Sequence, residues 1–344
     1  MATEGPIPKP ELGHNASWAD DTFARRVRPG RKIGTHKWEV GGVIVIAGSP
    51  SFIGAAYLAS RAAGRAGAGI VYLASGRSVG VALAGAMPEV AHIVLPETDA
   101  PGSARRAVER LEPHLKKAKS VVIGPGLGDD ELTDHLLSAL FGFGGKNAQI
   151  GSNIGFGGPG LVTTNARDVA NSPIFGHEHI KLVIDADALT WLSKQEEWWT
   201  HMPQGRAVLT PHPGEMARLT GLSTEEIVAD PSHVAREYAE KWGQAVLMKS
   251  AYSAASDGKA TFVAEDAPTS LATAGTGDVL SGTVGALLAQ GLTPLDAAGL
   301  ALFAGAKAAR ALEYRFGDLG VIATDMPDQI AGVLGKLGTG NESR

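Results

Sequence analysis

The feature of this sequence that most constrains its fold is a repeated alternation of short aliphatic runs with segments of helical composition. The runs are rich in Val, Ile and Leu and are bounded by glycine or polar residues, which is typical of strands buried on both faces. Strands that alternate with helices form parallel sheets covered on both sides. We therefore predict an α/β fold with a mostly parallel central sheet, whose strands include residues 41–48, 69–74, 120–124, 181–187, 207–210 and 245–249.

Two segments interrupt this alternation. Asp257-Gly258 lies between two short alternating runs and predicts a β-hairpin. Residues 142–160 contain eight glycines in nineteen positions, which indicates either an insertion or mobile flap within residues 142–180, or a solvent loop without a role. After the hairpin we expect three helices, over residues 277–290, 294–314 and 325–337.

Length and the amino-terminal segment bear on domain organisation. A chain of 344 residues is long enough for one large α/β domain or two smaller ones. Residues 1–38 are polar and contain proline, so we expect an irregular arm there, with ordered structure beginning at Gly41.

Composition excludes several classes of function. The formal net charge is −5 and no basic patch is dense enough to follow a phosphate backbone, so nucleic acid is not an expected partner. The absence of cysteine excludes disulfides, thiolate metal ligands and a cysteine nucleophile. The amino terminus has no signal-peptide pattern and no apolar run reaches membrane-spanning length. We therefore expect a soluble cytoplasmic protein without a membrane partner.

The window Thr273–Gly282, "TAGTGDVLSG", is the strongest candidate site. A glycine-rich turn that enters a helix points backbone N–H groups in one direction, and the helix dipole adds positive charge there. Gly275, Thr276 and Gly277 are therefore a candidate anion hole. Asp278 follows in the first turn, where it either caps the helix or acts as a general base beside a bound phosphate.

A second candidate site is "LTPHPGEMARL", residues 209–219. Prolines on both sides of His212 restrict the backbone and direct its side chain out of the loop at the carboxyl end of a strand, where α/β folds bind ligands. Glu215 follows early in the next helix and is a candidate magnesium ligand. A structural histidine is the alternative interpretation of His212.

Three more strand ends carry candidate residues. The glycines of "VVIGPGLG", which include Gly126 and Gly128, permit close approach of a ligand. In "VIDADAL", Asp185 is a candidate magnesium ligand, and Asp187 is expected to cap the next helix. Lys249 ends another strand and is expected to face the same crevice, unless it is simply solvated.

The order of these motifs along the chain is more specific than any one of them. Together they resemble the ADP/ATP-dependent NAD(P)H-hydrate dehydratases, a branch of the ribokinase-like superfamily, over about residues 35–335. The matching strings are "THKWEVGGVIVIAGS", "GAAYLASRAAGRAGAGIVYLA", "MPEV", "VVIGPGLG", "VIDADAL", "LTPHPGE", "ATAGTGDVLSG" and "GVIATDM".

This resemblance implies both a fold and a reaction. The fold would be a ribokinase-like three-layer sandwich, formed here by one domain over residues 39–338. The reaction would repair NADH or NADPH that has been hydrated at the nicotinamide ring. A terminal phosphoryl group of ADP or ATP, with Mg²⁺, would pass to the hydroxyl of the hydrate, and phosphate would then be eliminated. The resemblance also implies a homo-oligomer, such as a tetramer, and the amino-terminal segment is too short to be a fused epimerase domain.

The resemblance also assigns roles to single residues. Asp278 would accept the hydroxyl proton while the backbone of Gly275–Gly277 holds phosphate. Ala55, Gly128 and His212 resemble contacts to the hydrated dinucleotide. Contacts to the adenine nucleotide would come from Gly277 and from the run Lys249, Ser250, Ala251, Tyr252 and Ser253.

The chain departs from the family pattern in two places. The family commonly has Lys-Gly-Ala-x-Thr where this chain has residues 249–253, so Ser250 replaces a glycine and Tyr252 adds bulk. A His-Gly pair common in the late helix is Ala304-Gly305 here. The altered run 249–253 is the best support for one alternative function, a non-catalytic nucleotide-binding regulator. A second alternative is a small-molecule kinase of the same superfamily, of the hydroxyethylthiazole or hydroxymethylpyrimidine type.

Overall fold

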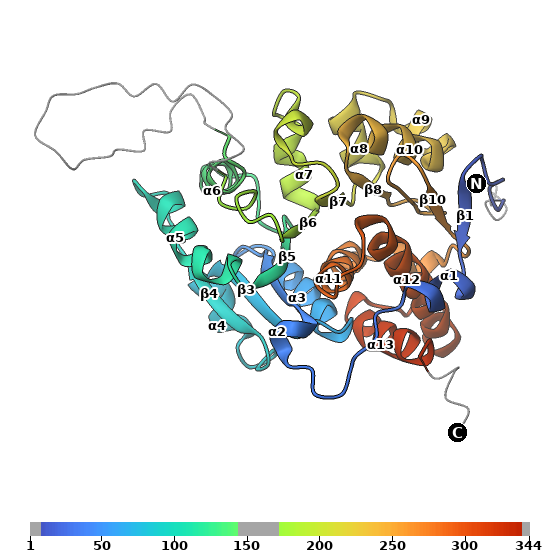
Figure 1. Ribbon diagram of the computed structural model, residues 1–344, viewed down its shortest axis with the longest axis horizontal. Helices are drawn as coiled ribbons and strands as arrows, with labels where there is room; N and C mark the ends of the chain where they lie inside the picture. The colour runs from blue at the N-terminus through green and yellow to red at the C-terminus, as the bar shows by residue number, and fades with distance from the viewer. Residues whose placement is uncertain (1–7, 144–171, 339–344) are drawn as a thin grey trace, which may run out of the picture.

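A single ten-stranded sheet forms the centre of the molecule (Figure 1). The computed structural model describes residues 8–143 and 172–338. The strands lie side by side in the order β1-β10-β9-β8-β7-β6-β5-β2-β3-β4. Their bounds are β1 Ala16–Ala19, β2 Gly42–Ile46, β3 Ile70–Gly76, β4 Ala91–Leu95, β5 Ala118–Ile123, β6 Lys181–Ile184, β7 Ala207–Leu209, β8 Ala245–Met248, β9 Ala254–Ser256 and β10 Thr261–Ala264.

The sheet confirms the predicted strands and adds two. From β8 through β4 all neighbours are parallel, whereas β9 is antiparallel to both β8 and β10. The hairpin predicted at Asp257-Gly258 joins β9 to β10. Strands β4 and β1 were not predicted from the sequence. Because β1 pairs in parallel with β10, the expectation that order begins at Gly41 is wrong.

Alternate residues of each strand point into two separate cores. In β2, Val43 and Val45 face one core, and Ile44 and Ile46 face the other. This alternation of side-chain direction is the period of an extended strand. All four residues are fully buried, as expected for a central parallel strand covered on both faces.

Different helices cover the two faces of the sheet (Figure 1). The core containing Val43 is closed by α1 Asp21–Val27, α3 Ile53–Arg65, α4 Arg77–Leu83, α11 Thr276–Ala289, α12 Pro294–Phe316 and α13 Met326–Lys336. The core containing Ile44 is closed by α5 Ser103–Leu115, α6 Glu131–Phe141, α7 Ala186–Leu192, α8 Pro213–Thr220, α9 Thr224–Ala229 and α10 Pro231–Trp242. The short elements are α2 Lys37–Val40, η2 Trp198–His201, η3 Thr269–Ala272 and η4 Ala323–Asp325.

The helices after the hairpin agree with the prediction from the sequence. The three helices expected after the hairpin are present as α11, α12 and α13. Within the described residues, no helix is long and apolar enough to cross a membrane. Most of the glycine-rich segment 142–160, and residues 144–171 as a whole, lie outside the described part of the chain.

Close packing of α11 on α3 depends on Gly282. A Cβ atom at this position would lie 2.1 Å from the carbonyl oxygen of Ala59 in α3. We expect Gly282→Ala to lower the free energy of unfolding by about 1–3 kcal/mol, because backbone must move to admit the methyl group.

Gly332 of α13 provides a matched control for this substitution. A Cβ there would meet nothing within 4 Å, so Gly332→Ala should raise the free energy of unfolding by about 0.5–1 kcal/mol through helix propensity alone. Urea denaturation of both variants measures the difference. Equal stability of the two would contradict the packing described for α11.

Candidate active site

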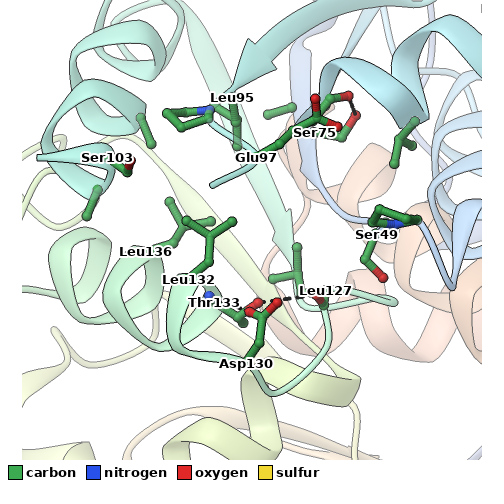
Figure 2. A pocket seen from close by; sticks show the side chains of 18 residues that line it. Ser49, Ser75, Leu95, Glu97, Ser103, Leu127, Asp130, Leu132, Thr133 and Leu136 are labelled. Atoms are coloured by element: carbon green, nitrogen blue, oxygen red, sulfur yellow. Dashed lines mark hydrogen bonds between the residues drawn. The ribbon is translucent and has the colours of Figure 1, made fainter. Parts of the chain in front are cut away.

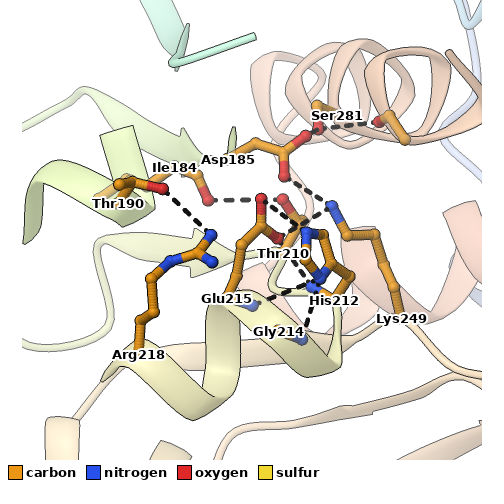
Figure 3. Close-up of polar contacts among 11 residues, drawn as sticks. Ile184, Asp185, Thr190, Thr210, His212, Gly214, Glu215, Arg218, Lys249 and Ser281 are labelled. Carbon is orange, nitrogen blue, oxygen red and sulfur yellow. Dashed lines mark hydrogen bonds and ion pairs between the residues drawn. The ribbon is translucent and has the colours of Figure 1, made fainter. Parts of the chain in front are cut away.

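The candidate residues meet at one edge of the sheet. Strands β5, β6, β7 and β8 are parallel neighbours, so the loops that follow them emerge at the same edge. The loop after β5 carries Gly126. The next three loops carry Asp185, His212 and Lys249, and α11 reaches the same place with Ser281 (Figure 3). The structure thus brings together residues that lie far apart along the chain.

The beginning of α11 has the geometry of an anion-binding site. Gly275 is the N-cap, with φ of +91°, a conformation that favours glycine. The hydroxyl group of Thr276 donates to the carbonyl oxygens of Leu271 (2.8 Å) and Thr273 (2.9 Å), which fixes the turn. Among the described residues, the backbone N–H groups of Gly277 and Asp278 have no acceptor. They are therefore free to donate to an anion at the positive end of the helix.

Asp278 is the third residue of α11, half-buried beside this turn. Burial raises the pKa of its carboxyl group to about 7, and the nearby carboxylate of Asp185 adds to the shift. A carboxyl group with such a pKa exchanges its proton near neutral pH, which is the property required of a general base. The carboxylate accepts no hydrogen bond from the described residues, so its role is not simply to cap the helix.

Lys249 is held between two buried carboxylates (Figure 3). Its Nζ lies 2.8 Å from Oδ1 of Asp185 and 3.5 Å from Oε2 of Glu215. The other oxygen of Asp185 accepts a hydrogen bond from the hydroxyl group of Ser281 in α11. Burial acts to lower the pKa of Lys249, but the two carboxylates outweigh it and raise the pKa, so the ammonium group stays charged. A Cβ on Gly277 would lie 3.5 Å from Nζ, which places this charge beside the anion-binding turn.

The same geometry bears on the magnesium ligands predicted at Asp185 and Glu215. The ammonium group of Lys249 occupies the position between the two carboxylates that a bound cation would take. Within the described residues, no group of three His, Asp or Glu side chains is arranged to hold a metal ion. The side chains at this site therefore do not fit a magnesium ion held by the protein alone.

His212 lies at the expected edge of the sheet but also has a structural role. It is the N-cap of α8, and its Nδ1 accepts from the N–H groups of Gly214 (3.0 Å) and Glu215 (3.3 Å). Burial lowers the pKa of the ring, and the positive charges of Lys249 and Arg218 add to this effect. The neutral ring then carries its proton on Nε2, which lies 3.5 Å from Oε1 of Glu215, and half of the side chain is exposed.

The loop after β5 packs against the start of α3. A Cβ at Gly126 would lie 2.7 Å from the Cβ atoms of both Ala55 and Phe52, so only glycine fits there, with φ of +62°. Two of the predicted ligand-binding residues, Ala55 and Gly126, are therefore adjacent. Gly128 has open space beside its Cα and donates its N–H to Oδ2 of Asp187 at 2.8 Å.

The prediction that Asp187 caps the helix after β6 is wrong. The N-cap position of α7 is taken by Asp185, whose carboxylate binds Lys249 instead of the helix amides. Ala186, between the two acids, adopts φ of +48°, an uncommon conformation for a residue with a Cβ atom. Asp187 lies in the first turn, and its carboxylate accepts from Gly128. It therefore ties the β6 loop to the β5 loop.

The run from Lys249 to Ser253 forms a turn between β8 and β9. The Ser253 hydroxyl accepts from the N–H of Ser250 (3.1 Å) and donates to its carbonyl oxygen (2.9 Å). Tyr252 is half-buried and packs against the core that contains Ile44. Ala251 is exposed at the tip. Both backbone groups of Ser250, which replaces the glycine common in the family, are therefore paired with Ser253.

Sequence reasoning missed two residues of the site. Ser281 lies one helical turn after Asp278, a spacing that could have indicated a shared helix face. Phe52 is the N-cap of α3 and remains 56% exposed although it is a large apolar residue next to Gly126. The sequence around Phe52 contains no pattern that would have predicted its exposure. The Ala304-Gly305 pair lies inside α12, where Ala304 is fully buried.

Comparison with known proteins gives the family. The family model described as NAD(P)H-hydrate dehydratase matches residues 43–142 and 156–331. The chain belongs to this family. It is 34% identical over 328 residues to a bifunctional NAD(P)H-hydrate repair enzyme of Salinibacter ruber, covering 94% of this chain and 54% of that protein. It is 32% identical over 320 residues to the ADP-dependent (S)-NAD(P)H-hydrate dehydratase of Xanthomonas campestris, covering 92% of this chain and 96% of that protein.

The matched relatives and solved structures differ in how much of their own length this chain covers. The chain spans about half the length of the bifunctional relatives it matches. Among solved structures, the ADP/ATP-dependent NAD(P)H-hydrate dehydratase of Bacillus subtilis, co-crystallised with ATP and Mg²⁺, superposes with a TM-score of 0.71 at 20% identity. That comparison covers 94% of this chain and all of the Bacillus subtilis chain, and it establishes the ribokinase-like fold.

The pKa of Asp278 predicts a pH dependence for a family member that uses it as a base. Because the pKa is raised to about 7, the carboxyl group is protonated and inactive as a base at lower pH. We expect kcat/KM to fall about tenfold per pH unit below this pKa and to level off above it. The pKa of His212 is lowered, so its ring stays neutral and adds no second limb in this range. A kcat/KM that is constant across pH 7 would contradict this assignment.

Proposed function

We propose that the chain dehydrates hydrated NADH or NADPH in a reaction driven by ADP or ATP. The observation that carries this proposal is the half-buried carboxyl group of Asp278, whose pKa is about 7. It lies beside the ammonium group of Lys249 and beside two backbone amides that have no acceptor in the described part of the chain. A base, an anion-binding turn and a fixed positive charge are the groups that phosphoryl transfer to a hydroxyl group requires.

The proposed reaction has two steps. Asp278 takes the proton from the hydroxyl group of the hydrate as its oxygen forms a bond to the terminal phosphorus of the nucleotide. The bond from that phosphorus to the leaving oxygen breaks, which releases AMP from ADP, or ADP from ATP. In the second step the carbon–oxygen bond breaks, phosphate leaves and a ring proton is lost, which restores the reduced nicotinamide. Family membership and the position of Asp278 support this sequence.

The residues around Asp278 would hold the reacting groups in place. The amides of Gly277 and Asp278 would donate to the transferring phosphoryl group, and Lys249 would offset its developing charge. The nucleotide would contact the turn of residues 250–253, whose tip residue Ala251 is exposed. The half-exposed ring of His212 and the surface around Ala55, Gly126 and Gly128 would contact the dinucleotide. Because the side chains do not fit a magnesium ion held by the protein alone, we propose that Mg²⁺ enters bound to nucleotide phosphates.

One alternative is supported by a specific comparison. Hydroxyethylthiazole kinase of Pyrococcus horikoshii superposes with a TM-score of 0.54, so a kinase of this superfamily shares the fold. A kinase would release a stable phosphorylated product, whereas a dehydratase eliminates phosphate. Family membership favours the dehydratase.

The test is to mix the protein and Mg²⁺ with hydrated NADH and either ADP or ATP, and to follow the absorbance of reduced nicotinamide. We expect the absorbance to return with at least one nucleotide and not without nucleotide. No return with either nucleotide would reject the proposal. A cytoplasmic location and a homo-oligomeric assembly, such as a tetramer, remain predictions.

A further inference from the structure

A pocket lies beyond the proposed reaction centre, along the same edge of the sheet (Figure 2). Its volume is about 190 Å³, and it is formed at the carboxyl ends of β2, β3 and β4 and by the facing sides of α5 and α6. Enclosing a whole drug-sized ligand takes about 300 Å³ or more. The pocket is therefore large enough for one part of a dinucleotide and too small for all of it.

The order of the strands places this pocket at the correct distance for the remote end of the dinucleotide. Asp185, next to Asp278, follows β6, and Glu97 follows β4, four strand spacings away in the order β6-β5-β2-β3-β4. Four spacings amount to roughly 19 Å. Ala55 and Gly126 lie between the two points, at the ends of β2 and β5. A single nucleotide cannot span this distance, but two nucleosides joined through a pyrophosphate can.

The lining of the pocket fits a nucleoside without a phosphate on its ribose. Its floor is apolar, with Leu95, Leu127 and Leu136, as a purine base requires. Among the described residues, the charged side chains in its lining are the carboxylates Glu97 and Asp130, and neither lysine nor arginine lines it. Two arginines lie beside the lining. Arg106 donates to Ser103 and to the carbonyl oxygen of Pro101, and Arg77 adds a smaller electrostatic effect on Glu97 than the hydrogen bonds from Ser78 do.

Glu97 is held at the mouth of this pocket. Its Oε1 accepts from both the backbone N–H (2.9 Å) and the hydroxyl group of Ser78, and the side chain lies against Gly76. These hydrogen bonds lower the pKa of Glu97, so the exposed carboxylate is ionised at neutral pH. A fixed carboxylate accepts hydrogen bonds from ribose hydroxyl groups and repels a phosphate at the same position.

We infer that this pocket binds the adenosine part of the hydrated dinucleotide and that Glu97 makes the protein select the NADH form over the NADPH form. The two forms differ by one phosphate on the 2′-hydroxyl of the adenosine ribose, where Glu97 would otherwise accept a hydrogen bond. The inference rests on the proposed function for the identity of the substrate. It assigns Glu97 to specificity and gives it no part in phosphoryl transfer.

The test is equilibrium binding of NADH and of NADPH to the full chain by calorimetry, which needs no turnover. Wild-type protein should bind NADH more tightly. Glu97→Gln keeps an acceptor for Ser78 and removes the charge, so it should reduce this preference on the order of fivefold, the effect of two unit charges about 4 Å apart in water. Glu109→Gln removes an equal charge from the exposed side of α5, away from the pocket lining, and should leave the preference unchanged.

A second variant tests the pocket itself. Ala104 of α5 lines it and is only half-buried, so Ala104→Leu fills space without disturbing the core. This variant should weaken binding of NADH and NADPH and leave ADP binding unchanged. Equal affinities of the wild-type protein for NADH and NADPH, an unchanged preference in Glu97→Gln, or unchanged dinucleotide binding in Ala104→Leu would overturn the inference. If selective binding is found but hydrated NADH is not dehydrated, the proposed function fails and the pocket assignment stands.

Discussion

Asp278→Asn is expected to lower kcat for dehydration of hydrated NADH by about 10²–10⁴-fold, because the amide cannot accept the hydroxyl proton. The substitution keeps the size of the side chain and removes a carboxyl group whose burial raises its pKa to about 7. The variant should therefore fold as stably as the wild-type protein at neutral pH and still bind nucleotide. Single-turnover kinetics with saturating ADP or ATP would measure the loss.

Asp296→Asn is the matched control for this experiment. Asp296 is also the third residue of its helix, α12, but its carboxylate lies at the surface and accepts from the Thr293 hydroxyl group at 2.8 Å. This variant removes the same charge from the same helical position and should keep full activity. Loss of a general base typically lowers the rate by about 10²-fold or more. If Asp278→Asn keeps more than about a tenth of wild-type kcat, the loss is smaller than this and Asp278 is not the base.

Lys249→Met is expected to have the second largest effect, on both stability and activity. It leaves the carboxylates of Asp185 and Glu215, which are 2% and 6% exposed, without their shared positive charge. Removing one partner of a buried ion pair costs about 3–5 kcal/mol of folding free energy. The variant also removes a charge beside the anion-binding turn, so kcat/KM should fall by about 10²-fold or more.

Two measurements separate these effects of Lys249→Met. Chemical denaturation gives the change in stability, and kinetics at a temperature where the variant remains folded gives the change in activity. Lys259→Met, in the exposed turn of the β9–β10 hairpin, removes the same charge and should change neither. Wild-type stability in Lys249→Met would show that the two carboxylates do not need the ammonium group.

Much of the sheet could be predicted from sequence because its strands are buried on both faces. Val43 to Ile46 are four consecutive aliphatic residues, and a run of this length bounded by glycine is typical of a central strand in an α/β protein. β1 could not be predicted in the same way. It is four residues long, lies in a polar segment and pairs with β10, which is distant along the chain, so its stability comes from a contact that the local sequence does not encode.

The positions of the site residues were easier to predict than their contacts. Asp278 lies where a glycine-rich turn enters a helix, and this is visible in the short window that surrounds it. The two acidic partners of Lys249 follow other strands, and no local pattern indicates that an ammonium group fills the expected magnesium site. Asp187 was mispredicted because Ala186 adopts a positive φ, which a sequence rule based on common conformations does not anticipate.

In the proposed function, this chain couples phosphoryl transfer to dehydration at Asp278. The most direct test is a stoichiometry measurement, in which reduced nicotinamide, free phosphate and consumed nucleotide are quantified in the same reaction with hydrated NADH. The proposed mechanism predicts that all three amounts are equal. It also predicts that in Asp278→Asn the formation of reduced nicotinamide, the release of phosphate and the consumption of nucleotide are all slower than in the wild-type protein. Consumption of nucleotide with a stable phosphorylated product, and without return of the reduced-nicotinamide absorbance, would contradict it and favour a kinase.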